Sequence, residues 1–362
     1  MISSQASFLR ALTVAVVLAL AAASCGSSDG GTASVDQAPT TETTAEPAPT
    51  TTTLATSTTD PTTEATADPA LVAPLTGEVV APDVDLDRPA LVLKIDNHPI
   101  ARPQTGLDEA DIVFDLRAES VTRFTAVFHS RVPDPAGPVR SSRTSDFDLL
   151  SGLDRPLYGS SGGNDYVMTA LRGVEAIAVT NETRLEYFRH TSRPAPHNLY
   201  VNASDLFALA PSDASRPDPW FRYRVAGDAL PSSAVASESE VTVAFRDGPT
   251  VGFTWDEGVG GWLRTQNGTP HLTADGEQLA PENVVIMVTT YGVSAADPVS
   301  PELNSIGSGE LLVLTDGHLI RGTWERPAET DKPSLFDQAG QEVVLTPGQT
   351  WVLYPERGQL SF

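Results

Sequence analysis

Cysteine is almost missing from this sequence: there is one in 362 residues, which excludes any disulfide within the chain. Lysine is nearly as rare, because Lys94 and Lys332 are the only two and arginine carries the remaining positive charge. The formal net charge is -24, which argues against an open nucleic-acid surface, since such surfaces need clustered cations to displace counterions. Hydrophobic residues make up 40% of the chain, so a core can form, and the length allows a tail plus one or two domains.

The N-terminus holds an apolar run that is too short to span a bilayer. Residues 11–23 form an uncharged stretch after Arg10, whereas a transmembrane helix needs roughly 20 residues. We therefore expect residues 1–24 to be a signal peptide. The run ends in small residues followed by Cys25, which resembles a bacterial lipobox, although Ala22 occupies the position where leucine is usual. In a lipobox the thiol is lipidated and the peptide before it is removed.

The resemblance predicts a palmitate-type anchor on Cys25 that holds the chain at the outer face of the cytoplasmic membrane, exposed to the extracellular or cell-wall space. The alternative is an ordinary secretory signal cleaved nearby, which would leave the thiol free or remove it. Residues 25–75 are rich in Thr, Ala and Pro and contain seven acids, no base and no aromatic residue. Such a segment cannot bury enough apolar surface to fold, so we expect a disordered acidic stalk with a reach of ~40 Å.

Residues 231–237 have the composition of a linker and divide the rest of the chain. We expect an α+β domain, a mixed α/β sandwich, at 76–228 and a β-rich domain at 238–362. Residues 77–225 hold 16 of the 22 cations that remain after Arg10, and four of the six histidines. Any chemistry should therefore be concentrated in the first of the two domains.

In the first domain, residues 90–95 form a nearly continuous apolar run that is typical of a buried strand. Residues 112–119 and 123–130 alternate between apolar and polar, as in a hairpin. A two-residue loop would pair Arg117 with Phe124 and mix the two faces, so we favour a three-residue loop that places Glu119 beside Arg123. The same register pairs 117 with 125 and 115 with 127. Residues 166–172 and 183–188 look helical.

The second domain reads as nearly all strand, which predicts a small β-sandwich or barrel. Asn267-Gly268 and Asp316-Gly317 are good hairpin turns. Four tryptophans in this part favour core packing over a sugar-binding platform (Trp255, Trp262, Trp324 and Trp351). The expected strands are residues 241–245, 251–255, 262–265, 284–289, 311–315, 319–324 and 343–345.

Several segments are distinctive, namely 88–99 (RPALVLKIDNHP), 101–107 (ARPQTGL), 110–113 (ADIV), 122–124 (TRF), 137–141 (GPVRS), 193–198 (RPAPHN), 306–309 (IGSG), Gly317, 322–324 (GTW) and 347–351 (PGQTW). Together they resemble the YerB-like family of bacterial lipoproteins, and the resemblance covers most of residues 76–355. It implies a two-domain envelope lipoprotein with an α+β first domain. It implies no activity, because the family's biochemical function is unassigned.

The strongest candidate site is a polar set in the first domain, in which several arginines follow strands. The planar guanidinium fork suits bidentate capture of a carboxylate or phosphate. The alternatives are a structural network, in which arginines tie down loops, and a protein–protein surface. The candidate ligand-binding residues are Asp96, Asn97, His98, Arg102, Gln104, Glu119, Arg123, Arg140, Ser141 and Arg143.

A second candidate is the segment Gly159–Gly163, which fits G-x-S-x-G. Ser161 would be the nucleophile and His197 the base, with an acid from Asp165 or Glu182. The competing interpretation is a helix N-terminus capped by Ser161 or Asn164. The same exposed amides could also bind an anion.

The sequence contains neither HExxH nor paired-cysteine spacing, so we expect no metal and no cofactor. Asp96, His98, His129, His190 and His197 are the available ligands. Our leading hypothesis is a non-catalytic binding or scaffolding role in the cell envelope, with an anionic or peptidoglycan-type ligand held by the first domain. The expected partners are the membrane and a cell-wall polymer or envelope protein, and no nucleic acid. The alternative is a serine-type envelope hydrolase that uses Ser161 and His197.

Overall fold

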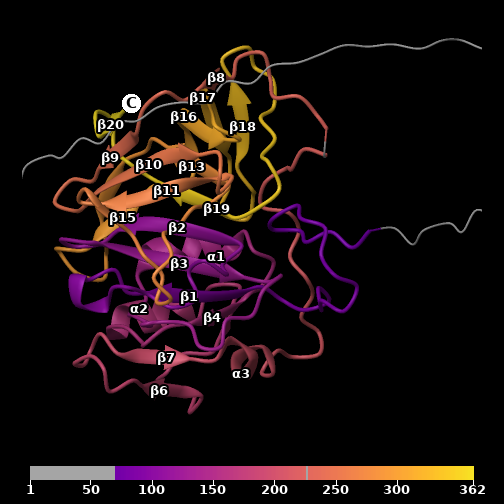
Figure 1. The fold of residues 1–362 in the computed structure, drawn as a ribbon. Coiled ribbons are helices and arrows are strands. Elements are labelled where there is room, and N and C mark those ends of the chain that lie inside the picture. The colour runs from indigo at the N-terminus through magenta and orange to yellow at the C-terminus, as the bar shows by residue number, and fades with distance from the viewer. Residues whose placement is uncertain (1–69, 226) are drawn as a thin grey trace, which may run out of the picture. The chain divides into compact units, whose positions relative to one another are not determined.

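The computed structural model of the protein describes residues 70–225 and 227–362. The predicted signal peptide, Cys25 and nearly all of the predicted stalk lie outside the described residues. Within the described ranges, no helix is both long and apolar enough to cross a bilayer. The protein is built mainly from strands, with a few short helices (Figure 1). The helices are η1 (Pro99–Ala101), η2 (Thr144–Asp146), α1 (Phe147–Ser151), α2 (Asp165–Leu171) and α3 (Ala203–Phe207).

One large sheet runs through both halves of the sequence, in the order β18-β17-β16-β13-β19-β2-β3-β1-β4-β5, with β8 pairing β17. Its strands are β1 (Leu91–Ile95), β2 (Ile112–Arg117), β3 (Thr122–Phe128), β4 (Leu157–Gly159), β5 (Ile177–Ala178), β8 (Val235–Ala236), β13 (Asn283–Met287), β16 (Gly307–Thr315), β17 (His318–Arg326), β18 (Ser334–Asp337) and β19 (Thr350–Leu353). The junction between the halves is β19, which pairs in parallel with both β13 and β2.

A second sheet has the order β12-β11-β10-β9-β20, and two hairpins stand apart from both sheets. The strands of this second sheet are β9 (Val241–Ala244), β10 (Thr250–Asp256), β11 (Gly261–Gln266), β12 (Thr269–Pro270) and β20 (Leu360–Ser361). One hairpin pairs β6 (Tyr187–Arg189) with β7 (Leu199–Val201), and the other pairs β14 (Tyr291–Val293) with β15 (Pro301–Leu303).

The large sheet is covered on both faces, which explains the apolar run of β1. Leu91, Leu93 and Ile95 belong to one hydrophobic cluster, whereas Val92 belongs to the other. All five residues of β1 are buried, as a strand in the middle of a two-sided core should be. Trp351 of β19 is fully buried in the first cluster, which agrees with the expected core role of the tryptophans.

The expected hairpin register is wrong. Arg117 pairs with Thr122 and Asp115 pairs with Phe124, so the loop holds four residues, not three. The expected register was chosen to keep apolar and polar side chains on separate faces of the hairpin. This argument fails because both faces are buried and the polar side chains on them are paired inside the protein. The contact between Glu119 and Arg123 is nevertheless present, at 3.4 Å between Oε2 and Nη2.

The β-rich half does not form a sandwich or barrel of its own, because β13 and β16–β19 extend the sheet of the first half. Residues 183–188, expected to be helical, form a turn followed by β6, whose Tyr187 donates to the Val179 carbonyl at 2.6 Å. Residues 343–345 are not a strand, although Val343 and Leu345 are buried.

Several local expectations are confirmed. Helix α2 covers the predicted helical segment 166–172 to within one residue. The turns at Asn267-Gly268 and Asp316-Gly317 have positive φ at both positions and close the hairpins β11–β12 and β16–β17.

The expected C-terminal bound of the stalk is wrong, because residues 73–75 belong to the folded protein. Ala73 and Leu75 are fully buried, and Leu75 packs in the second hydrophobic cluster. The physical reason is the change in composition at residues 70–75, where the apolar residues Leu71, Val72, Ala73 and Leu75 follow the acidic segment.

Candidate functional site

Four strands of the large sheet bring polar residues to one edge. β1 and β4 run in parallel, and β2 runs in the same direction because both β1 and β2 are antiparallel to β3. The segments after β1, β2 and β4 therefore meet at the same edge, where β3 begins. These segments supply Asp96, Glu119 and Ser161, and β3 supplies Arg123. In open α/β sheets, whose strands are mostly parallel, ligands bind beyond the carboxyl ends of the strands, and in this mixed sheet β1, β2 and β4 share such an end.

Asp96 is the centre of this edge. Its side chain is 2% exposed, and its Oδ2 lies 2.7 Å from His197 Nδ1 and 3.4 Å from Arg140 Nε. Its Oδ1 accepts the His98 backbone N–H at 3.0 Å. The His98 ring stacks on the His197 ring, with centroids 4.3 Å apart and planes 19° apart. Three groups from three separate segments, the His197 ring, the Arg140 guanidinium and the His98 amide, are thus held together by one buried carboxylate.

Arg123 is a buried cation with incomplete bonding. It is 8% exposed, and its Nε and Nη1 atoms are buried without a hydrogen-bond partner. Burial, together with the charge of Arg143, lowers the pKa of Arg123 to about 10. This guanidinium therefore has two donors that the protein leaves unused, in a position where an unsatisfied donor is costly.

Glu119 balances part of this positive charge. It accepts from Arg143 Nε at 3.0 Å and from Ser300 Oγ at 3.2 Å, in addition to its contact with Arg123. Burial alone would raise the pKa of Glu119, but the charges of Arg123 and Arg143 outweigh burial and lower it. Three arginines, with Arg140 included, thus share the two carboxylates Asp96 and Glu119, and Asp297 also interacts with the charge of Arg143.

Ser141 and Ser161 lie side by side, with their Oγ atoms 3.3 Å apart, and Ser161 N donates to the Arg140 carbonyl at 2.9 Å. Among the described residues, no hydrogen bond joins Ser161 to His197. The acid paired with His197 is Asp96, not the expected Asp165 or Glu182. Asn164 caps helix α2 by accepting from Val167 N at 2.9 Å.

Asn97 and Gln104 face the other side of the sheet and join a buried polar network. Asn97 Nδ2 donates to Gln266 Oε1 at 3.2 Å, and Gln104 Oε1 lies 2.8 Å from His271 Nε2. The network contains the ion pair between Asp115 Oδ2 and Arg264 Nη2, 2.8 Å apart with both side chains fully buried. These bonds connect the two halves of the chain.

Arg102 is separate from the other arginines and lines a cavity of about 310 Å³ with Pro103, Gln266, His271 and Leu272. The structure therefore brings together three of the four arginines singled out from the sequence, Arg123, Arg140 and Arg143.

Two buried ion pairs were missed by sequence reasoning. Lys94 pairs with Asp146, and both are almost completely buried. Asp146 also accepts from Tyr158 OH at 2.9 Å and from Thr125 Oγ1 at 2.8 Å. Burial lowers the pKa of Lys94, although Asp146 opposes the effect. For the first pair, the sequence contains one signal of a buried charge, a lysine inside an apolar strand. For the second pair, Asp115 with Arg264, the sequence contains no comparable signal.

In residues 70–225 and 227–362, no group of three or more His, Cys, Asp or Glu residues could hold a metal ion. His129 and His190 lie apart from Asp96: the His129 ring contacts the Arg88 carbonyl, and the His190 ring contacts Ser192 Oγ.

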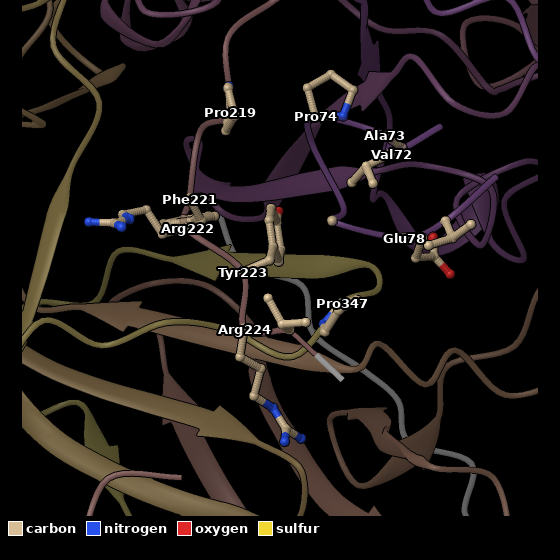
Figure 2. A pocket seen from close by; sticks show the side chains of 13 residues that line it. Val72, Ala73, Pro74, Glu78, Pro219, Phe221, Arg222, Tyr223, Arg224 and Pro347 are labelled. Carbon is tan, nitrogen blue, oxygen red and sulfur yellow. The ribbon is translucent and has the colours of Figure 1, made fainter. Parts of the chain in front are cut away.

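The protein also has a larger cavity, of about 780 Å³, and Figure 2 shows the side chains that line it. It is lined by residues 72–74, 77–79, 219, 221–225 and 347. Its two cations are already paired, Arg222 with Glu342 at 2.6 Å and Arg224 with Asp316 at 2.6 Å. None of the site residues predicted from the sequence lines it.

Two family models match the chain. The model described as "Protein of unknown function (DUF3048) N-terminal domain" matches residues 75–216, and its C-terminal counterpart matches residues 241–352. A Bacillus subtilis (strain 168) protein named "Putative lipoprotein YerB" is 28% identical over 304 residues, which are 78% of this chain and 85% of the relative. This chain belongs to the YerB-like family.

The crystal structure of the YerB protein from Bacillus subtilis has the same fold, with a TM-score of 0.68. It is 24% identical in sequence, and the match covers 80% of this chain and 99% of that chain. The two halves of this YerB-like chain correspond to two family domains, yet their strands form one continuous sheet.

Proposed function

We propose that the protein is an exported lipoprotein that binds an anionic ligand of the cell envelope, without catalysis, at the sheet edge around Arg123. The two parts of this proposal rest on different observations. The location rests on the N-terminal sequence and on the relative's name, and the binding role rests on the arginine cluster.

The anchor is Cys25, the one cysteine of the chain, directly after a short apolar run. A relative that is itself named a lipoprotein agrees with this assignment. In the proposed arrangement, acyl chains on Cys25 hold the protein at the outer face of the membrane. A stalk beginning at Cys25 then separates the membrane from the two domains, which we assign to residues 76–228 and 238–362.

The binding role is carried by the two unused donors of Arg123. Arg140 and Arg143 lie near this guanidinium, since both of their charges lower the pKa of Arg123, and their side chains are 23% and 22% exposed. The Nε and Nη1 atoms of Arg123 are buried, so in this proposal an anion displaces one of these two side chains to reach them. A hydrogen bond between arginine and an anion is about twice as strong as one between neutral groups. A phosphate or a carboxylate carries several oxygen atoms, so two arginines can share one such group. Phosphate-bearing wall polymers and peptidoglycan peptides with free carboxylates both fit this chemistry.

A thermal-shift screen of the full-length protein tests the binding role directly. We expect stabilisation by a phosphorylated wall polymer or by muropeptides, and loss of that stabilisation in Arg123→Gln. The matched control is Arg222→Gln, which removes an arginine whose side chain is 71% exposed and remote from the edge. If both variants respond to the polymers as the wild type does, the site around Arg123 is not a ligand site.

A serine hydrolase is the second candidate, and one observation favours it. The Asp96 carboxylate contacts His197 Nδ1 at 2.7 Å, which is the arrangement that orients a catalytic base. A change of the Ser161 rotamer would have to bring its hydroxyl group to the other ring nitrogen. Labelling with a fluorophosphonate probe separates the two candidates: a hydrolase is labelled and Ser161→Ala is not, whereas a binding protein remains unlabelled.

A further inference from the structure

We propose that the cavity at Arg102 is a second binding site, specific for a single carboxylate carried on a small apolar group. The site is distinct from the edge around Arg123. Among residues 70–225 and 227–362, no carboxylate and no hydrogen-bond acceptor contacts the Arg102 side chain, and its Nε is buried without a partner. A cation on a cavity wall without a protein partner is placed to take its counterion from a ligand.

The cavity lies at the junction of the two family domains. The first domain supplies Arg102 and Pro103, which follow helix η1, and the second domain supplies residues 269–274. The two segments are held together by backbone pairing, in which Ala274 N donates to the Gln104 carbonyl at 3.0 Å and Gln104 forms a β-bridge with Thr273. A ligand in this cavity would therefore touch both domains, and domain junctions are common positions for small-molecule sites.

The charges around the cavity leave one positive charge without compensation. Arg264 lies behind the wall and is neutralised by Asp115 at 2.8 Å. Burial, and then the charges of Arg264 and Arg102, hold the pKa of His271 well below its usual range, so this ring is neutral at pH 7. Asp275 and Glu277 flank the segment but do not line the cavity. The arrangement favours a monoanion over a multiply charged phosphate.

The lining of the cavity determines which group can carry the carboxylate. Pro103, Pro270, Leu272 and Ala274 provide an apolar lining, and the Leu272 side chain is 40% exposed. The volume of about 310 Å³ accommodates a group of a few carbon atoms, at the lower end of the range for ligand cavities. A guanidinium fork binds one carboxylate through two parallel hydrogen bonds. The C-terminus of a short apolar peptide and a short-chain carboxylic acid share this chemistry.

Isothermal titration of the full-length protein in detergent tests the site with two peptides that differ only in the C-terminal group. The probes are N-acetyl-dialanine, with a free carboxylate, and N-acetyl-dialaninamide. We expect the acid to bind and the amide to bind at least about tenfold more weakly, because the amide lacks the charge-assisted bonds. Hexanoate serves as a third probe, and we expect it to bind as well, because it carries a carboxylate on a small apolar body.

Two substitutions of Arg102 separate charge from shape. Arg102→Gln should lose at least about tenfold in affinity for N-acetyl-dialanine, and Arg102→Lys should retain part of it. Both variants should keep the wild-type unfolding midpoint, since the Arg102 side chain makes no hydrogen bond within the described residues. Arg123→Gln should bind the peptide normally, so that failure of the proposed function leaves this site unaffected. The proposal is overturned by equal binding of acid and amide, by no binding of either acid, or by an Arg102→Gln variant that binds as the wild type does.

Discussion

The buried pair between Asp115 and Arg264 gives the sharpest stability prediction. Both side chains are fully buried, and they link the large sheet to β11 at 2.8 Å. The substitution Arg264→Met removes the cation, fills a similar volume and leaves Asp115 as a charge without a partner. Breaking a buried pair from one side costs about 3–5 kcal/mol. Burial already raises the pKa of Asp115, with Arg264 opposing that rise, so the orphaned carboxyl will protonate and the loss should fall at the lower end of this range.

Urea unfolding followed by tryptophan fluorescence measures the change, because Trp351 lies against the Arg264 guanidinium, 4.7 Å from the ring centroid. The double variant Asp115→Asn with Arg264→Met should recover much of the lost free energy, since no charge then remains buried. The control is Arg357→Met, which breaks an exposed pair with Glu310 and should cost less than about 1 kcal/mol. A loss in Arg264→Met no larger than in this control would refute the assignment of the pair as a buried structural link.

Three further predictions concern acid stability, a close strand contact and the anchor. Burial lowers the pKa of His129 from 6.5 to about 4. The free energy of unfolding therefore decreases as the pH falls from 6.5 to about 4, by at most roughly 1.4 kcal/mol per pH unit. Urea unfolding of His129→Gln should show a smaller decrease of this free energy over the same pH range. Gly322→Ala should destabilise by about 2 kcal/mol or more because the added carbon would meet the Phe336 carbonyl of β18, whereas Gly292→Ala, where space is ordinary, should change the urea midpoint little. Mass spectrometry of protein from the native host should find Cys25 acylated and N-terminal, and an unmodified thiol there would rule out the lipid anchor.

Local features of the fold could be predicted from the sequence because they depend on near neighbours. The apolar run of β1 requires burial on both faces, and Asp316-Gly317 requires a tight turn with positive φ. Helix α2 follows directly from its Asn164 cap. These signals need no knowledge of the rest of the chain.

The long-range pairings could not be predicted, because no local pattern encodes them. β19 enters the sheet beside β2, more than 200 residues away, so the separate β-sandwich was a reasonable but wrong expectation. The register of the β2–β3 hairpin was also predicted wrongly. That prediction kept polar and apolar side chains on separate faces, whereas both faces are buried.

The polar residues predicted to form one site lie in two separate places, which the composition of the chain does not reveal. Arg123, Arg140 and Arg143 gather at one edge, while Arg102 lies at another cavity with His271 from the second domain. The partner of His197 is Asp96, 101 positions earlier in the chain. Only the parallel alignment of β1 and β4 brings their following segments together.

The dissociation constant of the Arg123→Gln variant for an anionic envelope polymer tests the proposed binding role most directly. Isothermal titration would use the polymer that most stabilises the wild-type protein, with Arg222→Gln titrated in parallel. The two unused donors of Arg123 predict at least about a tenfold loss of affinity in Arg123→Gln and no change in Arg222→Gln. Wild-type affinity in Arg123→Gln, with an unchanged unfolding transition, would contradict the proposed site.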